Sequence, residues 1–445
     1  MSGTNAALKS FSHGVHPPEC KEATEAKAIR RLPFAGEMRI PLSQHLGAPA
    51  KPIVREGQEV VRGEPIAEPG GFVSVPMHAP ATGVVERIAL APDHRGGMSL
   101  SIFLRLHPSA SQEILYGAPQ DIDRLSPEEL VSAVQATGVV GLGGAAFPTH
   151  VKLAVPEGKK VDTVIVNGCE CEPYLTTDHR VMLEQPDYIM DGIRTVMKAV
   201  GAERAIVGVE ENKMDAVAKL RASIPEGLPV TVEPLCVKYP QGAEKMLAKA
   251  LLGREIPSGG LPADVGVAVF NVATLAQIGD LLPKHQGLIE RVVTLTGPGL
   301  SKPGNYLIAL GTPLRFALEQ AGFDGDVSQV VLGGPMMGAT AATLDMPLTK
   351  GITGIVVMRP EDVAKPKKVY PCIKCGACLA ACPMRLNPSR LGVLARKGRY
   401  EEMDAHFHLR DCFECGSCSY VCPSNIPLVQ HFRIAKAQNR KRSAK

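Results

Sequence analysis

The same cysteine spacing occurs twice near the end of this 445-residue chain. Each copy reads C-x2-C-x2-C-x3-C-P, a run that holds paired [4Fe–4S] clusters. In that design three thiolates of one run hold one cluster, and the fourth cysteine crosses to the other cluster. The two predicted ligand sets are Cys372, Cys375, Cys378 and Cys422 for the first cluster, and Cys412, Cys415, Cys418 and Cys382 for the second.

A zinc site and a disulfide framework are the two alternatives for such cysteines. Zinc sites usually take paired C-x2-C dyads rather than three cysteines followed by C-P. Disulfide frameworks belong to short secreted chains, and no apolar signal-peptide segment is recognised at the start of this sequence. The spacing therefore favours iron–sulfur clusters in a reducing compartment, and a chain that carries electrons.

The amino-acid composition argues against a nucleic-acid partner and against a membrane span. The net charge is only +4 and tryptophan is absent, which argues against a nucleic-acid partner. No uninterrupted run of about 18 apolar residues occurs, so we expect no membrane span in this chain. If the protein works at a membrane, other subunits must hold it there. The basic run that ends at Lys445 is expected to be a solvated tail.

Changes in sequence pattern predict five segments. Residues 36–107 have short strands with Gly and Pro turns, and they resemble the lipoyl/biotinyl barrel-sandwich hybrid. The hairpin tip at 72–77 lacks the lysine that a carrier domain modifies, so this unit is predicted to be structural. The predicted segments are an arm (1–35), the barrel-sandwich hybrid (36–107), an α/β domain (115–288), a second β domain (289–360) and a two-cluster bacterial-ferredoxin domain with a basic tail (366–445).

Strand and helix patterns alternate between residues 161 and 282. Apolar runs at 161–166, 205–209, 230–235 and 265–270 predict strands, and helical patterns follow them. This alternation predicts a Rossmann-like, mostly parallel sheet with helices on both faces. Polar residues follow three of the strands, at the carboxyl edge where open α/β sheets bind ligands.

A glycine-rich string begins at Gly141 and formally fits G-x-G-x-x-A. A dinucleotide fingerprint must follow a strand and open a helix. Here a predicted helix, which starts after the N-cap Ser126 and ends near Ala136, precedes the string, and Phe-Pro-Thr follows it. The glycines alone therefore indicate only a close approach of backbone to some partner.

Two longer strings carry a family resemblance. GGAAFPTHVKL (143–153) and NGCECEPY (167–174) resemble the flavin-binding core of the NADH-oxidising subunit of respiratory complex I. Residues 289–360 resemble an SLBB β-grasp module. Together with the N-terminal barrel and the two cysteine runs, they make the chain similar to the RnfC family, the peripheral subunits of Rnf electron-transport complexes.

The resemblance implies non-covalent FMN as cofactor and NADH as substrate. No general acid or base is implied, because positioning of the nicotinamide on FMN does the work. Three glycines would face the cofactor, Lys152 would reach its phosphate, and Phe147 would stack on the adenine of NADH. Glu172 would bind a ribose hydroxyl of NADH, with Glu244 as a second candidate. The remaining implied cofactor residues are Gly141, Gly143, Gly144, Asn167, Glu170, Tyr239, Gly242, Asn271 and Thr274.

The implied activity is that of an NADH:acceptor oxidoreductase subunit. It would exchange electrons between NAD(H), FMN, two [4Fe–4S] clusters and ferredoxin or a ferredoxin-like subunit, coupled to ion translocation by the other subunits of a membrane complex. The implied location is the cytoplasmic face of the bacterial inner membrane, without a membrane span in this chain.

Two alternatives remain open at this stage. A cobalamin reductase of the propanediol-utilisation type shares the flavin core and paired clusters, but by resemblance lacks this arm and barrel. A non-catalytic electron-wire or scaffold subunit is favoured by Leu142, which stands where the complex I subunit usually has an arginine. Cys169 and Cys171 also depart from that pattern, and we expect both to be free thiols.

Overall fold

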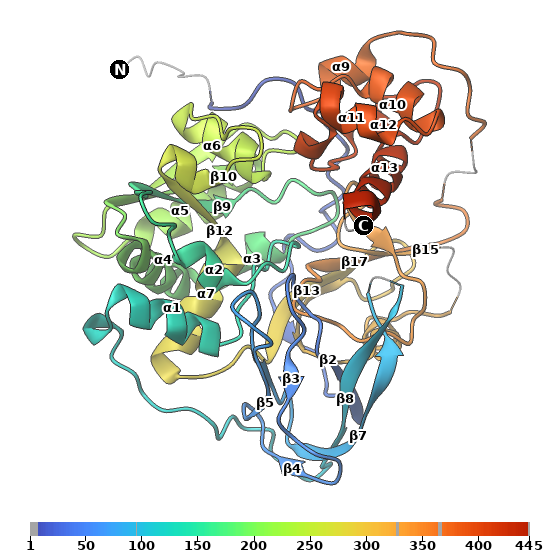
Figure 1. Ribbon diagram of the computed structural model, residues 1–445. Helices are drawn as coiled ribbons and strands as arrows, with labels where there is room; N and C mark the ends of the chain where they lie inside the picture. Colours follow the sequence, from blue (N-terminus) through green and yellow to red (C-terminus); the bar gives the residue numbers. More distant parts are fainter. Residues whose placement is uncertain (1–7, 95, 326–328, 364–366, 444–445) are drawn as a thin grey trace.

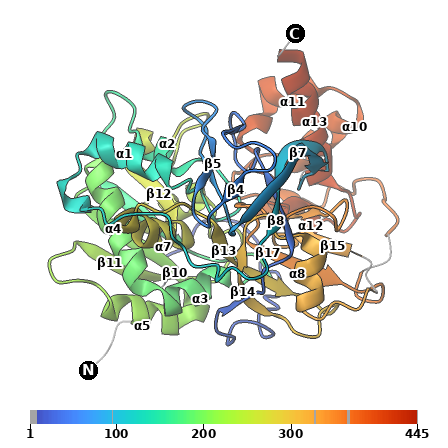
Figure 2. The ribbon, with the colours of Figure 1, turned by 90° about the horizontal axis from the view of Figure 1, so that it is seen from below.

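The computed structural model describes residues 8–94, 96–325, 329–363 and 367–443. Figure 1 shows an α/β region on one side, two β units below, and a helical region that carries the cysteine runs above them. Figure 2 views the same molecule from the side of the β units. Residues 1–7 of the predicted arm, Pro366 at the start of the predicted ferredoxin domain, and the last two residues of the basic tail lie outside the described residues.

The α/β region contains the predicted parallel sheet. Its strand order is β11-β10-β9-β12, and all three pairings are parallel. β9 reads TVIVNG and is buried along most of its length, as expected for a strand covered on both faces. The fold class predicted for this region is confirmed. The strands are β9 (Thr163–Gly168), β10 (Arg204–Glu210), β11 (Val230–Leu235) and β12 (Val267–Asn271).

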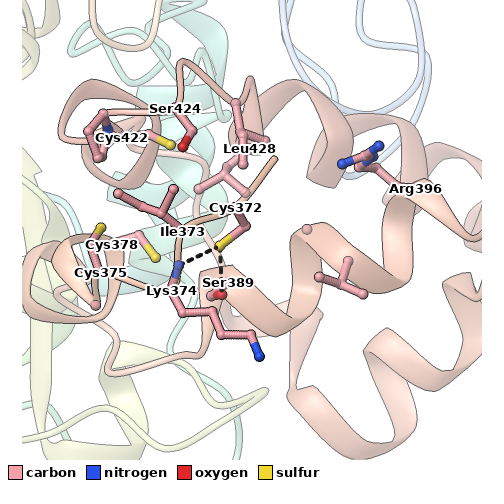
Figure 3. Close-up of a pocket in the computed structure, with 15 residues that line it drawn as sticks. Cys372, Ile373, Lys374, Cys375, Cys378, Ser389, Arg396, Cys422, Ser424 and Leu428 are labelled. Carbon is pink, nitrogen blue, oxygen red and sulfur yellow. Dashed lines mark hydrogen bonds between the residues drawn. The ribbon is translucent and has the colours of Figure 1, made fainter. Parts of the chain in front are cut away.

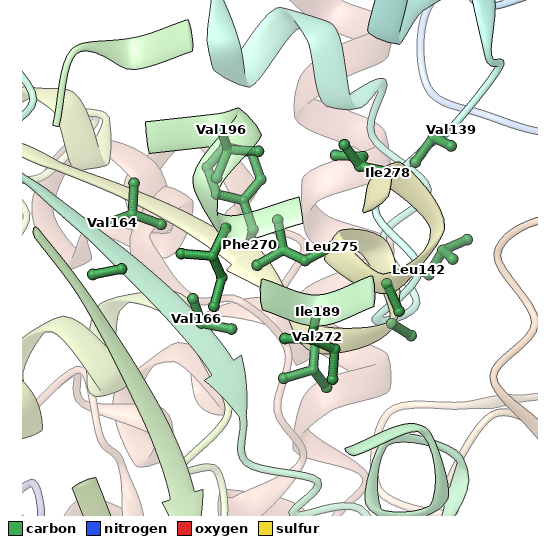
Figure 4. Packing of buried hydrophobic residues seen from close by; sticks show 14 of the residues in the cluster. Val139, Leu142, Val164, Val166, Ile189, Val196, Phe270, Val272, Leu275 and Ile278 are labelled. Carbon is green, nitrogen blue, oxygen red and sulfur yellow. The ribbon is translucent and has the colours of Figure 1, made fainter. Parts of the chain in front are cut away.

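Helices cover both faces of this sheet. On one face α4 packs closely against α7, and Figure 4 shows their apolar side chains meeting Val164, Val166 and Phe270 of the strands. Gly192 allows this approach, because a Cβ there would lie 2.1 Å from the carbonyl oxygen of Leu275. On the other face α6 packs its leucines on alternate strand residues. The helices are α1 (Pro127–Ala136), α2 (Thr149–Leu153), α3 (Thr177–Glu184), α4 (Pro186–Val200), α5 (Met214–Ala222), α6 (Glu244–Leu252) and α7 (Val272–Leu281).

Helix α1 begins at the predicted capping residue. The Ser126 hydroxyl accepts from the backbone N–H of Glu129 at 3.2 Å, and the Glu129 carboxylate accepts from the Ser126 N–H at 2.7 Å. Such a reciprocal pair satisfies two of the N–H groups that a helix start leaves free. The predicted start and end of this helix are confirmed.

The first β unit consists of two small antiparallel sheets. Strands β2-β8-β7-β4 form one sheet and β3-β5-β6 form the other, and their inward side chains share one core. The strands are β2 (Glu37–Pro41), β3 (Lys51–Pro52), β4 (Glu59–Val60), β5 (Pro65–Glu68), β6 (Met77–His78), β7 (Gly83–Pro92) and β8 (Met98–Leu106).

The second β unit has a mixed sheet in the order β1-β14-β13-β17-β15-β16. A parallel pairing of β13 with β17 lies at its centre, and α8 (Leu314–Gln320) contributes to the same core. The strands are β1 (Arg30–Arg31), β13 (Glu290–Thr296), β14 (Gly304–Ala309), β15 (Gln329–Leu332), β16 (Ala339–Thr340) and β17 (Gly354–Met358).

The N-terminal arm connects three parts of the molecule. Its Gly14 N–H donates to the Ala381 carbonyl in the cysteine-bearing region, and its Val15 N–H donates to the Tyr239 carbonyl in the α/β region. Strand β1 then pairs with β14 of the second β unit. These long-range contacts hold the arm in place. The arm therefore does not need the repeating apolar face that would give its sequence a periodicity.

The cysteine-bearing region (367–443) consists of helices joined by loops, and its described residues include no β-strand. Gly376 and Gly416 stand at the same place in the two runs, and each opens a short helix with φ near +80° (79° and 81°), where glycine is favoured. Within the described chain, no helix combines the length and apolar character needed to cross a bilayer. The helices are α9 (Ala377–Ala381), α10 (Pro388–Arg396), α11 (Tyr400–Phe407), α12 (Ser417–Tyr420) and α13 (Leu428–Ser443).

Candidate functional site

The first predicted cysteine set surrounds one pocket. Figure 3 shows Cys422 of the second run beside Cys372, Cys375 and Cys378 of the first, with α10 forming another wall. The backbone N–H of Lys374 donates to the Cys372 sulfur at 3.4 Å. This N–H, assisted by the Ser389 hydroxyl, lowers the pKa of Cys372 and favours the thiolate form that binds iron.

The second predicted set is more deeply buried. Burial raises the pKa of the Cys412 thiol to about 11, and its neighbours Cys415 and Cys382 add to the rise. Burial also raises the pKa of Cys418, where Cys412, Cys415 and Cys382 again contribute. Cys382 of the first run therefore acts electrostatically on Cys412 and Cys418 of the second, as expected of cysteines that share one site.

The donor set fits iron–sulfur clusters. All twelve cysteines are free of disulfides, and each lies in the described part of the chain. Two sets of four soft thiolate donors, one of them seen around a pocket, suit clusters of several iron atoms better than zinc.

The predicted flavin residues gather where β9 and β12 end. Asn167 and Asn271 are direct neighbours across these two strands. The glycine loop lies beside them, because a Cβ on Gly143 would be 3.4 Å from Asn271. The N–H of Leu142 donates to the Thr274 hydroxyl at 2.9 Å, which holds the loop against the start of α7.

Two predicted charged residues form an ion pair at this edge. The Lys152 ammonium donates to the Glu244 carboxylate at 2.7 Å and to the Val269 carbonyl at 3.1 Å. Both side chains remain about a third exposed, so the lysine is accessible to an anionic group. Nearby, the Asn167 amide donates to the Gly242 carbonyl at 2.8 Å.

Two residues predicted to bind the cofactor or NADH use their side chains in other contacts. The Glu170 carboxylate accepts from the N–H groups of Asp178 and His179 at the start of α3 (2.9 and 3.3 Å). Glu172 accepts from the N–H groups of Met336 and Met337 in the second β unit (3.1 and 2.9 Å), and burial raises its pKa.

Tyr239 turns toward the second cysteine run. Its hydroxyl donates to the Cys415 carbonyl at 2.7 Å, and its ring packs with Val15, Cys171, Met336 and Cys415. The predicted cofactor and NADH roles of Tyr239, Glu170 and Glu172 stay predictions. Phe147 is half-buried, and its carbonyl accepts from the Gly141 N–H at 2.8 Å. Its predicted stacking role also stays a prediction.

Asp178 is a candidate site residue that the sequence pattern did not indicate. The Asn271 amide donates to its Oδ2 at 2.6 Å, while its buried Oδ1 has no hydrogen-bond partner among the described residues. Burial, assisted by Glu170, raises the pKa of Asp178 to about 7. An unpaired buried oxygen beside Asn271 is a feature expected where a polar cofactor edge binds. The residues present therefore fit FMN.

Two buried cations support this region from outside the α/β domain. Arg291 of β13 donates to the Leu142 carbonyl of the glycine loop at 3.0 Å. Lys21 of the arm donates to the carbonyls of Glu170 and Glu172 at 2.8 and 3.0 Å. In the sequence, Arg291 could have been noticed as a charged residue inside the otherwise apolar run ERVVTLT. The arm offered no comparable signal for Lys21.

Four family models match the chain in order. They are the RnfC barrel sandwich hybrid domain at residues 9–106, the Nuo51 FMN-binding domain at 134–280, the SLBB domain at 292–340 and the 4Fe-4S dicluster domain at 371–426. The predicted multidomain fold class and the predicted cofactors, FMN and two [4Fe–4S] clusters, are confirmed by these matches.

A similar solved structure supports the fold. The NAD+-reducing [NiFe]-hydrogenase in its air-oxidised state superposes with a TM-score of 0.52 at 20% identity, covering 70% of this chain and 62% of the hydrogenase chain. At this identity the likeness concerns the fold alone.

Curated relatives align along nearly the whole chain. A subunit of the proton-translocating ferredoxin:NAD(+) oxidoreductase complex of Clostridium ljungdahlii is 44% identical over 97% of this chain and 94% of its own length. Its Na(+)-translocating counterpart in Acetobacterium woodii is 41% identical over 98% of this chain and 99% of its own length. The chain therefore belongs to the RnfC family, whose members are subunits of ion-translocating ferredoxin:NAD(+) oxidoreductase complexes.

Proposed function

We propose that this chain exchanges electrons between NAD(H) and iron–sulfur carriers as an oxidoreductase subunit of an ion-translocating membrane complex. The observation that carries the proposal is the contact between Tyr239 and Cys415, at 2.7 Å. It joins the loop after β11, which belongs to the flavin-type domain, to the backbone of a predicted cluster ligand. One chain therefore holds a hydride-accepting site against a one-electron site.

The chain's own residues prepare the flavin site. When bound, FMN accepts a pair of electrons from NADH and releases them singly. Lys152 would hold its phosphate, while Asn167, Asn271 and the glycine loop would hold its polar edges. The Asp178 carboxyl, paired on one oxygen with Asn271, offers its other oxygen to the same place. The protein would contribute by positioning the two reactants, and acid–base catalysis is not required.

The cysteine-bearing region would hold the two [4Fe–4S] clusters. Cys372, Cys375, Cys378 and Cys422 would hold the first, and Cys412, Cys415, Cys418 and Cys382 the second. Hydrogen bonds to sulfur and burial tune the potential of such clusters. The first set receives the Lys374 N–H at its rim, and the second lies beneath Tyr239 and Met336.

The partners follow from the family. The relatives are named as subunits of complexes that translocate protons or sodium ions and react with ferredoxin and NAD(+). This chain therefore takes its place as a peripheral subunit at the cytoplasmic face of the inner membrane, beside the other Rnf subunits and ferredoxin. Nucleic acid is not among the expected partners.

Neither alternative is favoured. A cobalamin reductase does not account for the RnfC-type domain at 9–106 or for ferredoxin:NAD(+) oxidoreductase relatives that cover 97% of the chain. The scaffold alternative depends on Leu142, whose side chain is buried and whose backbone serves the loop through Thr274 and Arg291. Leu142 therefore has a structural role that does not require loss of the cofactor site.

An oxygen-free titration of the purified chain with NADH tests the proposal. We expect NADH to bleach the bound flavin, with up to about two NADH consumed per chain, because the flavin takes two electrons and each of the two clusters takes one. A chain with intact clusters and no NADH-reducible flavin would overturn the proposal and support the scaffold alternative.

A further inference from the structure

The N-terminal arm buries one lysine against the loop that follows β9. Lys21 is only 4% exposed. Its Nζ donates to the backbone carbonyls of Glu170 and Glu172 at 2.8 and 3.0 Å, and also to that of Leu175. A neutral amine has only two N–H donors, so three acceptors require the charged ammonium form. The loop at 169–175 therefore encloses a positive charge that another part of the chain supplies.

The three contacts satisfy the Lys21 ammonium without neutralising it. Each acceptor is an uncharged carbonyl group, and each belongs to the same loop. Burial lowers the pKa of Lys21, because a charge taken out of water loses its hydration. An apolar side chain of similar length would fill this place without that loss. A buried charge beside predicted cofactor residues is therefore a candidate for a functional role.

The carboxylates near Lys21 are engaged by other groups. Glu170 and Glu210 both act electrostatically on Lys21. Glu210 forms a buried ion pair with Lys213 at 3.1 Å, so that pair carries no net charge. The Glu170 carboxylate accepts from two backbone N–H groups of α3. Lys21 therefore adds positive charge to the loop and does not complete a direct ion pair with either carboxylate.

Further contacts between the arm and this loop fix the position of Lys21. The Tyr174 N–H donates to the Glu19 carbonyl at 2.8 Å, and the Thr176 hydroxyl donates to the Thr24 hydroxyl at 2.8 Å. In Figure 1 the arm, in dark blue, passes between the α/β region and the cysteine-bearing region. The charge is thus held in place before any substrate binds, which is the arrangement in which a fixed charge acts most strongly.

We propose that Lys21 raises the reduction potential of the flavin bound beside this loop. The inference rests on the proposed function, and it assigns a role to a residue outside the segment that matches the FMN-binding family model, 134–280. A hydride leaves the nicotinamide carbon of NADH with both electrons of its C–H bond, which oxidises NADH to NAD+ and reduces the flavin by two electrons. The hydride adds one negative charge to the site, and a buried cation nearby stabilises that charge.

A redox titration of the flavin in the holo chain tests the proposal. Lys21→Gln keeps a polar side chain with N–H donors but removes the charge. We expect the equilibrium constant for reduction of the bound flavin to fall at least about tenfold, which is about 30 mV for a two-electron couple. Lys21→Arg, which keeps the charge, should stay close to the wild-type potential. A lysine that only supports the fold would change FMN affinity or the melting temperature and leave the potential unchanged.

A second variant tests the charge balance without altering the arm. Glu210→Gln removes a negative charge that acts on Lys21 from the same cavity, so it should raise the flavin potential. The matched control is Lys219→Gln on α5, because Lys219 is exposed and solvent screens its charge. K219Q should keep the wild-type potential.

Three results would overturn the role of Lys21. They are a potential in K21Q at or above that of the wild type, an equal fall in K21Q and K21R, and a potential in E210Q at or below that of the wild type. The NADH titration separates this inference from the proposed function. Wild-type flavin that NADH bleaches, together with an unshifted potential in K21Q, would overturn the role of Lys21 alone, whereas absence of NADH-reducible flavin in the wild type would overturn the proposed function.

Discussion

The two cysteine runs have the same spacing and opposite surroundings. The run that begins at Cys412 is packed against the α/β region, where Tyr239 donates to the Cys415 carbonyl and a Cβ on Gly416 would lie 2.8 Å from the Met336 oxygen. At the equivalent position of the run that begins at Cys372, nothing described lies within 4 Å of a Cβ on Gly376. One sequence pattern has therefore produced an inner site, fixed by the rest of the protein, and an outer site that faces solvent.

The largest expected effect comes from removing one cysteine ligand from each of the two predicted cluster sites. Cys415→Ala and Cys375→Ala should each reduce iron from about eight atoms per chain, the content of two four-iron clusters, to about four. Cys415→Ala should also lower the melting temperature more, because its loop forms the contact with the α/β region. Iron analysis and thermal unfolding measure both effects. Unchanged iron in either variant would contradict the ligand assignment.

A second prediction tests whether the flavin site is independent of both clusters. Lys152→Gln should weaken FMN binding by about tenfold or more, since it removes the charge expected at the phosphate, a loss of about 1.4 kcal/mol. Iron should stay near eight atoms per chain. Fluorescence of released flavin gives the affinity. FMN affinity equal to that of the wild type would remove Lys152 from the cofactor site.

A third prediction concerns the contact that makes the inner site different. Tyr239→Phe removes a hydroxyl whose positive hydrogen points at the Cys415 carbonyl. Because that dipole stabilises added negative charge, its loss should lower the reduction potential of the Cys415 cluster by some tens of millivolts; 59 mV corresponds to about 1.4 kcal/mol for one electron. The outer cluster should not change. An EPR-monitored redox titration measures each cluster, and equal shifts in both would contradict the comparison.

The smallest predicted effect is a pH dependence at Glu172, which accepts hydrogen bonds from Met336 and Met337 of the second β unit. Burial raises the pKa of Glu172 above its ordinary value of about 4.5, so the folded state keeps this proton to higher pH than the unfolded state does. The free energy of unfolding should therefore fall as pH rises above about 4.5. Glu172→Gln should remove this part of the fall. Urea unfolding at several pH values provides the comparison, and identical pH slopes would contradict it.

The sequence predicted those features that depend on neighbouring residues. The four strands of the parallel sheet follow from apolar runs, and α1 begins where Ser126 and Glu129 form a capping box. The cysteine spacing predicted two sets of four thiols, and Cys422 indeed lies beside the first run. Their roles as cluster ligands stay a prediction, as do the roles of the flavin residues.

Features that depend on how distant segments dock were not predictable from local pattern. Glu172 meets Met336 and Met337 across 164 and 165 residues, and Tyr239 meets Cys415 across 176 residues. Nothing near Asp178 in the sequence distinguishes it from an ordinary helix carboxylate, because the amide that donates to it belongs to Asn271, 93 residues away. The difference between the inner and outer sites likewise arises from docking of whole regions. In the sequence, the two runs differ at the equivalent position, which is a lysine at 374 and a glutamate at 414.

Solvent access to each cluster tests the difference between the inner and outer sites most directly. A neutral dysprosium chelate added to the reduced holo chain should speed the spin relaxation of one [4Fe–4S] EPR signal much more than that of the other. We expect the strongly affected signal to be the one lost in Cys375→Ala, and the signal lost in Cys415→Ala to be shielded. Equal relaxation of both signals, or the opposite assignment, would show that the two sites do not differ in this way.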